Sequence, residues 1–145
     1  MSFTSDVKQE LSLKPYDEKE ERAVLSALIQ MTSSISVSSR GMAISLITEN
    51  AAVSRAAYRM MKSRYEVNIE TSVRRRMNLN KNLIYALKIY GPVTDILKDL
   101  GLYSARGLLD RPLQKIVAKD AWARTYLAGA FMADGSVNNP QTSRY

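Results

Sequence analysis

The chain contains no cysteine and no histidine among its 145 residues. These two absences exclude disulfide bonds, thiol or imidazole nucleophiles and the usual kinds of zinc site. No apolar run reaches the roughly 20 residues that a membrane-spanning helix needs. Residues 1–10 also lack the apolar core of a signal peptide. We therefore expect a cytoplasmic protein with no membrane partner.

The residues that are present are those of a globular domain, because 46% are hydrophobic and 24% are charged. The length suits one domain with a sizeable core. The net charge is +7, and residues 51–90 account for all of it with nine basic and two acidic side chains. Such a concentration predicts a phosphate-binding surface, and the alternative is a solvated basic face. The nine basic residues are Arg55, Arg59, Lys62, Arg64, Arg74, Arg75, Arg76, Lys81 and Lys88.

Hydrophobic periodicity and capping residues predict the order helix–strand–strand–helix–strand–strand–helix over residues 17–101. Asp17 and Glu20 have the spacing of a capping box, and Asn50 caps the second helix. The expected elements are a short helix at 2–13, a helix from Asp17 to about Met31, strands at 34–38 and 42–48, a helix after Asn50, strands at 67–74 and 83–89, a short helix from Pro92 to Leu100, and one helical turn at 113–117.

The four expected strands alternate between apolar and polar side chains, which is typical of a sheet with one buried face. Ile44, Leu46, Tyr85 and Leu87 point to the buried side. The outward set is Ser34, Ser36, Ser38, Ser45, Asn68, Glu70, Ser72, Arg74 and Lys88. The sequence thus predicts an α+β domain with a polar sheet face, which is either functional or merely solvated.

The run Leu127–Gly135 resembles the LAGLIDADG signature of homing endonucleases, with six of nine letters matching. Small residues such as Ala128 and Gly129 allow two helices of this kind to pack backbone to backbone. The penultimate residue, Asp134, would hold a divalent cation beside a DNA phosphate. The alternative is an ordinary amphipathic helix ended by a glycine.

A second, weaker copy of the motif occurs at Leu25–Ser33, and its Ser26 and Ala27 are expected to pack against Ala128 and Gly129. Thr32 takes the place of Asp134 in this copy. A neutral hydroxyl is a poor ligand for a hard cation, so one of two metal-binding carboxylates is missing. We therefore expect no catalysis, no metal and no other cofactor, with a vestigial cation site at Asp134 as the alternative.

The expected organisation is a first half-domain at 1–101, a linker at 102–119, and a second motif helix beginning a second half-domain at 120–145. Four further strands would complete that second half, so we expect the chain to be a truncated piece of a longer protein. The uncovered side of the second motif helix is expected to drive self-association as a two-fold dimer. Its residues are Trp122, Tyr126, Ala130 and Phe131.

Three segments together resemble the WhiA sporulation-regulator family: Met1–Phe3, Thr48–Ala52, and the motif with Gly135–Pro140 after it. The resemblance implies a LAGLIDADG homing-endonuclease-like fold without nuclease activity. It also implies a bacterial, nucleoid-associated, DNA-binding transcriptional regulator of sporulation and cell division. Full-length members carry a C-terminal helix-turn-helix domain as well.

The resemblance further implies that double-stranded DNA lies against the polar face of the sheet. The expected DNA-binding residues are Ser36, Ser38, Arg40, Ser45, Asn68, Ser72, Arg74, Arg75, Arg76, Lys81 and Lys88. Two alternatives stay open. One is an active nuclease, and the other is a protein-interaction or scaffold domain that contacts transcription machinery or another regulator, with DNA binding left to the helix-turn-helix domain.

Overall fold

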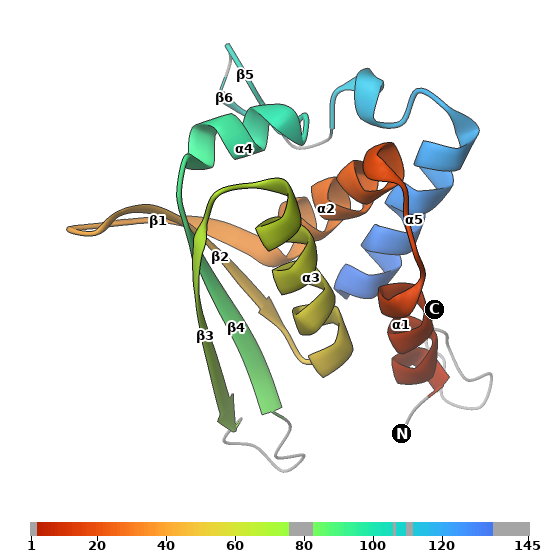
Figure 1. Ribbon diagram of the computed structural model, residues 1–145, viewed down its shortest axis with the longest axis horizontal. Helices are drawn as coiled ribbons and strands as arrows, with labels where there is room; N and C mark the ends of the chain where they lie inside the picture. Colours follow the sequence, from red (N-terminus) through yellow and green to blue (C-terminus); the bar gives the residue numbers. More distant parts are fainter. Residues whose placement is uncertain (1–2, 76–82, 106, 110–111, 135–145) are drawn as a thin grey trace, which may run out of the picture.

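The computed structural model describes residues 3–75, 83–105, 107–109 and 112–134 (Figure 1). The helices and strands follow the order that the sequence predicts, and the short helix expected at residues 2–13 is present as well. The elements are α1 (Phe3–Leu13), α2 (Glu18–Thr32), β1 (Ser33–Ser38), β2 (Gly41–Thr48), α3 (Ala51–Arg64), β3 (Asn68–Arg75), β4 (Leu83–Tyr90), α4 (Val93–Asp99), β5 (Tyr103–Ser104), β6 (Gly107–Leu108), η1 (Gln114–Ile116) and α5 (Asp120–Asp134).

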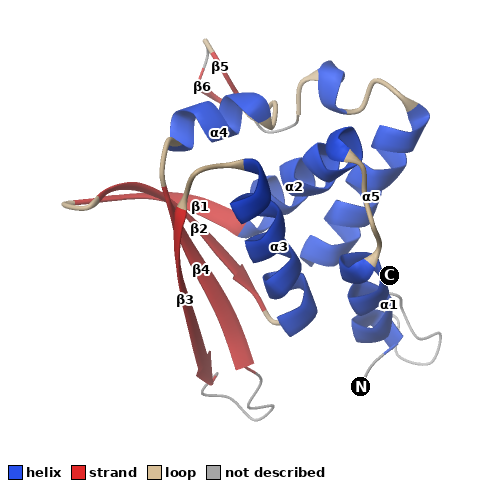
Figure 2. Ribbon diagram, viewed as in Figure 1, coloured by secondary structure: helices blue, strands red, loops and turns tan. Residues whose placement is uncertain are grey.

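The first four strands form one antiparallel sheet in the order β1-β2-β4-β3. A row of four isoleucines, Ile35, Ile44, Ile89 and Ile69, crosses all four strands in register. Ile44 and Ile89 are fully buried, because α2, α3 and α4 pack over this side of the sheet (Figure 2). The alternation of apolar and polar residues therefore predicted the covered face correctly.

The helix starts predicted from capping residues are confirmed. The Asp17 side chain accepts the Glu20 N–H at 2.8 Å, and the Glu20 carboxylate accepts the Asp17 N–H at 3.0 Å. Asn50 Oδ1 accepts the Val53 N–H at 3.0 Å. These bonds satisfy N–H groups that have no partner within the first turn of a helix.

The two motif helices, α2 and α5, pack at very short range. A Cβ atom on Gly129 would lie 2.5 Å from the carbonyl oxygen of Val24 and 3.0 Å from the Cβ of Ala27. Only glycine allows this approach, as the motif predicts. The hydroxyl of Ser26 donates to the Leu100 carbonyl at 2.8 Å and so joins α2 to α4, while its expected packing against α5 stays a prediction.

The placement of Tyr126 differs from the prediction that it lies on the uncovered side of α5. Its hydroxyl donates to the Gln30 side chain at 2.5 Å, so the ring belongs to the contact with α2. Met132 is also fully buried in the core. The large apolar side chain that α5 exposes most is Leu127, at 66%. Self-association through this side of the helix stays a prediction.

The segment between α4 and α5 packs against the domain. Residues of β5 and β6 pair as a short hairpin, and the single turn expected at Leu113–Val117 is present as η1. Leu102 and Ile116 are buried. None of the described helices is long and apolar enough to cross a membrane.

We predict that Gly129→Ala destabilises the domain by about 1–3 kcal/mol, because the added methyl group must push α5 away from α2. Helix propensity alone would favour alanine by about 1 kcal/mol, so the sign of the effect is informative. Urea unfolding would measure it. The control is Leu127→Ala on the exposed side of α5, with an expected change of about 0.5 kcal/mol or less. An unchanged or raised stability of Gly129→Ala would show that the two helices do not pack this closely.

Candidate nucleic-acid interface

None of the described helices lies on the second face of the sheet, and polar side chains cross this face in register. One row runs Ser34, Ser45, Lys88 and Glu70 across the four strands. The neighbouring row runs Ser36, Ala43, Tyr90 and Asn68. Short serine side chains predominate on β1 and β2, whereas longer and charged ones lie on β4 and β3. This open face is the candidate interface.

Most of the predicted DNA-binding residues share the open face. By register, the sheet places Ser36, Ser45, Asn68, Ser72, Arg74 and Lys88 there, with Ser38 at the end of the β1–β2 hairpin. Sequence reasoning missed two kinds of neighbour. Tyr90 lies in the same rows, and Ile47, Ile84 and Ala86 give the face an apolar portion near β4. The strand alternation carried the signal for both, since these positions have the same parity as Ser45 and Lys88.

Three predicted phosphate-binding residues are not on this face or cannot be placed. Arg75 pairs with Leu83 and has the parity of the helix-covered side, although it is exposed because the strand extends past the helices. Arg76 and Lys81 lie outside the described residues. The open face therefore receives fewer described cations than the sequence predicted.

The basic residues of segment 51–90 do not form one surface, which corrects the prediction made from their spacing. Four of them lie on α3, on the other side of the sheet. Arg59 Nη2 donates to the Ser12 carbonyl at 3.1 Å, and Lys62 Nζ donates to the Val67 carbonyl at 3.0 Å. These bonds fasten neighbouring segments to the helix, so part of the excess positive charge has a structural use.

Arg64 is the centre of a half-buried cluster that joins α2, α3 and α4. Its guanidinium contacts Glu18, Glu21 and Asp99, the last at 3.3 Å. The hydroxyl of Tyr65 donates to the same Asp99 carboxylate at 2.6 Å. Burial, followed by the bond to Asp99, raises the pKa of Tyr65 well above its usual value. The cluster fixes the residues just before β3 against the helix that follows β4, and so holds the two strands that carry Arg74 and Lys88.

Arg40 lies differently from the predicted phosphate contact at a hairpin turn. Its Nη1 atom is 2.6 Å from Glu70 Oε2, and its Cζ atom lies 4.5 Å from the centre of the Tyr90 ring. The Ser38 hydroxyl accepts the Arg40 N–H at 3.2 Å, and Gly41 follows at a φ of +106°. The hydrogen bond to Glu70, and then its charge, raise the pKa of Arg40. The arginine is therefore turned back over the open face.

Thr32 lies at the position where a nuclease of this kind would have a metal ligand, and its side chain bonds within its own helix, α2. Its hydroxyl donates to the Leu28 carbonyl at 2.6 Å. Asp134 is the last residue of α5, and its side chain lies outside the described part of the structure. Among the described residues, no three acidic, histidine or cysteine side chains gather where they could hold a metal ion.

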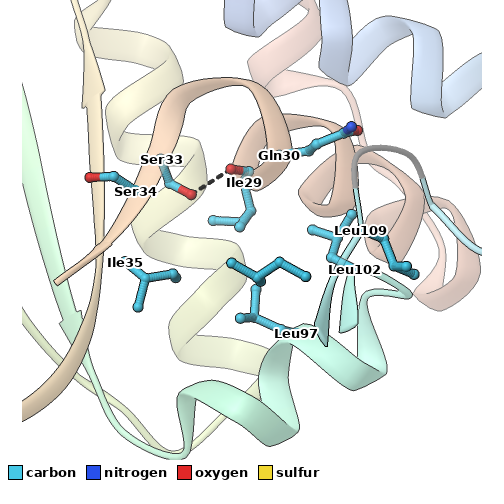
Figure 3. A pocket seen from close by; sticks show the side chains of 9 residues that line it. Ile29, Gln30, Ser33, Ser34, Ile35, Leu97, Leu102 and Leu109 are labelled. Carbon is cyan, nitrogen blue, oxygen red and sulfur yellow. Dashed lines mark hydrogen bonds between the residues drawn. The ribbon is translucent and has the colours of Figure 1, made fainter. Parts of the chain in front are cut away.

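A hollow of 150 Å³ lies where α2 meets β1, beside α4 and the β5–β6 hairpin (Figure 3). Its walls are mainly apolar, with Ile29, Ile35 and Leu97 among the residues that line it. The Ser33 hydroxyl at its rim donates to the Ile29 carbonyl and is therefore occupied. The hollow has no charged side chain, so it is suited to an apolar group and to no acid–base chemistry.

The fold, the close contact of two motif helices and the open sheet define a LAGLIDADG-like domain. Residues 18–103 match the family described as the WhiA N-terminal LAGLIDADG-like domain. The chain belongs to the WhiA family.

Curated relatives support this assignment over the full length of the chain. It is 41% identical over 145 residues to the "Probable cell division protein WhiA" of Lactiplantibacillus plantarum, covering all of this chain and 47% of the relative. It is 42% identical over 146 residues to the protein of the same description from Bacillus cytotoxicus, covering all of this chain and 46% of that one. The chain thus spans about half the length of these relatives.

Two solved structures share the fold. The crystal structure of the N-terminal LAGLIDADG domain of DUF199/WhiA matches with a TM-score of 0.65 at 23% identity, over 97% of this chain and 62% of that one. Full-length DUF199/WhiA from Thermatoga maritima matches with a TM-score of 0.63 at 22% identity, over 98% of this chain and 42% of that one. At these identities the likeness establishes the fold alone.

We predict that Asp99→Asn lowers the free energy of unfolding by about 1 kcal/mol at pH 7, since the partly exposed carboxylate accepts bonds from Tyr65 and Arg64. Burial alone would raise the pKa of Asp99, but the bonds from Tyr65 and Arg64 and the charge of Arg64 lower it below the usual value of an aspartate. The native state therefore gains stability above that value and loses it as the pH falls through the lowered pKa.

The difference between the wild type and Asp99→Asn should accordingly shrink to nothing in acid, as followed by urea unfolding at a series of pH values. The control is Glu66→Gln, which changes an exposed carboxylate just before β3 and should have an effect of about 0.5 kcal/mol or less at every pH. A difference that persists in strong acid would show that the carboxylate charge is not what stabilises the cluster.

Proposed function

We propose that this domain binds duplex DNA through the open face of its sheet. In this proposal it is a non-catalytic part of a bacterial transcriptional regulator that acts at the nucleoid in cell division and sporulation. The observation that carries the proposal is the sheet face that none of the described helices covers. Two rows of mainly polar side chains cross it in register, and Arg74 and Lys88 project from it.

The dimensions of the sheet suit a DNA groove. Neighbouring strands lie about 4.8 Å apart, and the major groove of B-DNA is about 12 Å wide, so a two-stranded ribbon fits inside it. The serines of β1 and β2 are short enough to let the ribbon approach base edges closely. Arg74 and Lys88 extend from the other half of the sheet, where they can reach phosphates.

In such a domain the motif helices have a structural role and do not cleave DNA. A metal-dependent nuclease needs carboxylates to hold its cations. Thr32 offers a hydroxyl that is already bonded within α2. The small residues of the motif retain their use as packing surfaces, because Gly129 lies directly against Val24.

A second candidate is a protein-interaction domain, with DNA bound by another part of the longer protein. Charge favours this candidate. Glu70 neutralises Arg40, and Arg59, Lys62 and Arg64 are used inside the domain, so the open face is less basic than the net charge suggests. Transcription machinery, another regulator, or a second copy docked at Leu127 of α5 would be the partner.

We predict that the purified chain does not cleave plasmid DNA in the presence of magnesium or manganese, because Thr32 cannot replace a carboxylate ligand. Conversion of supercoiled plasmid to nicked or linear forms, followed on agarose gels, measures this. Asp134→Ala serves as the matched sample and should behave like the wild type. Cleavage by the wild type that Asp134→Ala abolishes would reveal a working metal site.

We predict that the double variant Arg74→Ala/Lys88→Ala binds duplex DNA more weakly and with a flatter salt dependence. Each phosphate contact contributes about 0.9 to the slope of log K against log salt, so the slope should fall by up to about 1.8. Fluorescence anisotropy over a range of salt concentrations provides both quantities.

The matched control is Arg55→Ala/Arg124→Ala, which removes the same charge from exposed positions on α3 and α5. Its slope should stay close to that of the wild type. Equal losses in both double variants would mean that only net charge matters. Absence of binding by the wild type at low salt would favour the interaction domain.

A further inference from the structure

The ion pair between Arg40 and Glu70 stands apart from the others in the described part of the chain. The remaining pairs join Lys19 or Arg64 to acidic groups on the helices. The Arg40–Glu70 pair instead lies on the open face, between the tip of the β1–β2 hairpin and β3. It therefore sits inside the surface that would face DNA.

Neither stability nor attraction to phosphates explains an ion pair at this place. The side chains of Arg40 and Glu70 are 59% and 51% exposed, and exposed pairs contribute little to stability. A carboxylate on this face, here on the edge strand β3, would also repel the DNA backbone. The same carboxylate is favourable only where amino groups approach it, and the floor of the major groove presents such groups on cytosine and adenine.

The contact leaves hydrogen-bonding atoms of both side chains available for a partner. It uses Nη1 of Arg40 and Oε2 of Glu70, so the other guanidinium N–H groups and Oε1 of Glu70 are not part of it. A planar guanidinium donates in a fork to O6 and N7 of guanine, and a carboxylate accepts from the N4 amino group of cytosine. These three atoms lie on the major-groove edge of one G·C base pair.

Resting on the DNA binding proposed above, we propose that Arg40 and Glu70 together read a G·C base pair in the major groove. Arg40 donates to the guanine and Glu70 accepts from the cytosine. In an A·T base pair, the adenine amino group is a donor where guanine has the O6 acceptor, and thymine carries a methyl group and no amino group. Arg40 and Glu70 would therefore find no matching partners there.

The surroundings of Arg40 hold it ready for this contact. The Ser38 hydroxyl fixes its backbone N–H, the Tyr90 ring lies under its guanidinium, and Glu70 orients its plane. A long side chain that is already held in one geometry loses less entropy on binding. Tyr90 and Glu70 are thus positioning residues for Arg40, and Glu70 is a reading residue as well.

Binding of the 145-residue chain to three alternating duplexes of equal length tests the proposal. Poly(dG-dC) and poly(dI-dC) present the same major-groove pattern, whereas poly(dI-dC) and poly(dA-dT) both lack the minor-groove amino group. We expect the first two to bind equally and at least about fivefold more tightly than poly(dA-dT), which is the lower limit for one well-made base contact.

The variants Glu70→Gln and Arg40→Lys should each reduce this preference to below about twofold. Arg40→Lys keeps the charge and loses the planar fork. Glu70→Gln removes a negative charge, so a purely electrostatic role would raise the affinity for all three duplexes evenly and keep their ratio. The controls Arg55→Lys on α3 and Glu66→Gln before β3 should retain the wild-type preference.

Several results would overturn the assignment. Equal binding of all three duplexes, an unchanged ratio in both variants, or a preference for poly(dG-dC) that poly(dI-dC) does not share would each refute major-groove reading by this pair. In those cases the salt-dependent effect of Arg74 and Lys88 would still support DNA binding. Failure of every duplex to bind at low salt would refute the DNA-binding function and the base reading together.

Discussion

The rest of the structure depends on the fact that the described helices cover only one face of the sheet. The isoleucine row through β1, β2, β4 and β3 supplies a continuous apolar surface, and α2, α3 and α4 exclude water from it. Because side chains alternate along a strand, burying that row forces the serines, Glu70 and Lys88 to the other side. The burial of this one face therefore determines both the core and the composition of the surface that is available to a partner.

Local patterns in the sequence predicted most of the fold. Capping by Asp17 and Asn50, the alternation in β1 and β2, and the glycine of the second motif each act over a few residues, so each can be recognised without knowing the structure. The end of strand β3, at Arg75, could not be predicted in this way. Extending the expected strand by a single residue reverses the face on which that residue lies, and strand ends are the least certain part of such a prediction.

The candidate site was harder to predict, because its charges depend on contacts between distant segments. The basic residues of α3 come shortly before those of β3 in the sequence. In the fold, however, α3 packs on the covered face of the sheet, whereas Arg74 of β3 points to the open face. Arg40, Glu70 and Tyr90 come from a hairpin turn, an edge strand and a central strand. Only the order β1-β2-β4-β3 brings them together, and no sequence spacing indicates that order.

Strand β3 has a consequence for the energetics of any partner it meets. Its residues from Glu70 to Arg75 are exposed on both faces, so hydrogen bonds to β4 hold this part of the strand with little burial to support them. Elements of that kind open locally at a small cost in free energy. A ligand that binds Arg74 must hold this part of the strand closed. Part of the favourable binding enthalpy is then offset by the conformational entropy that the strand loses. Heat should therefore weaken binding at this edge well before it unfolds the isoleucine core.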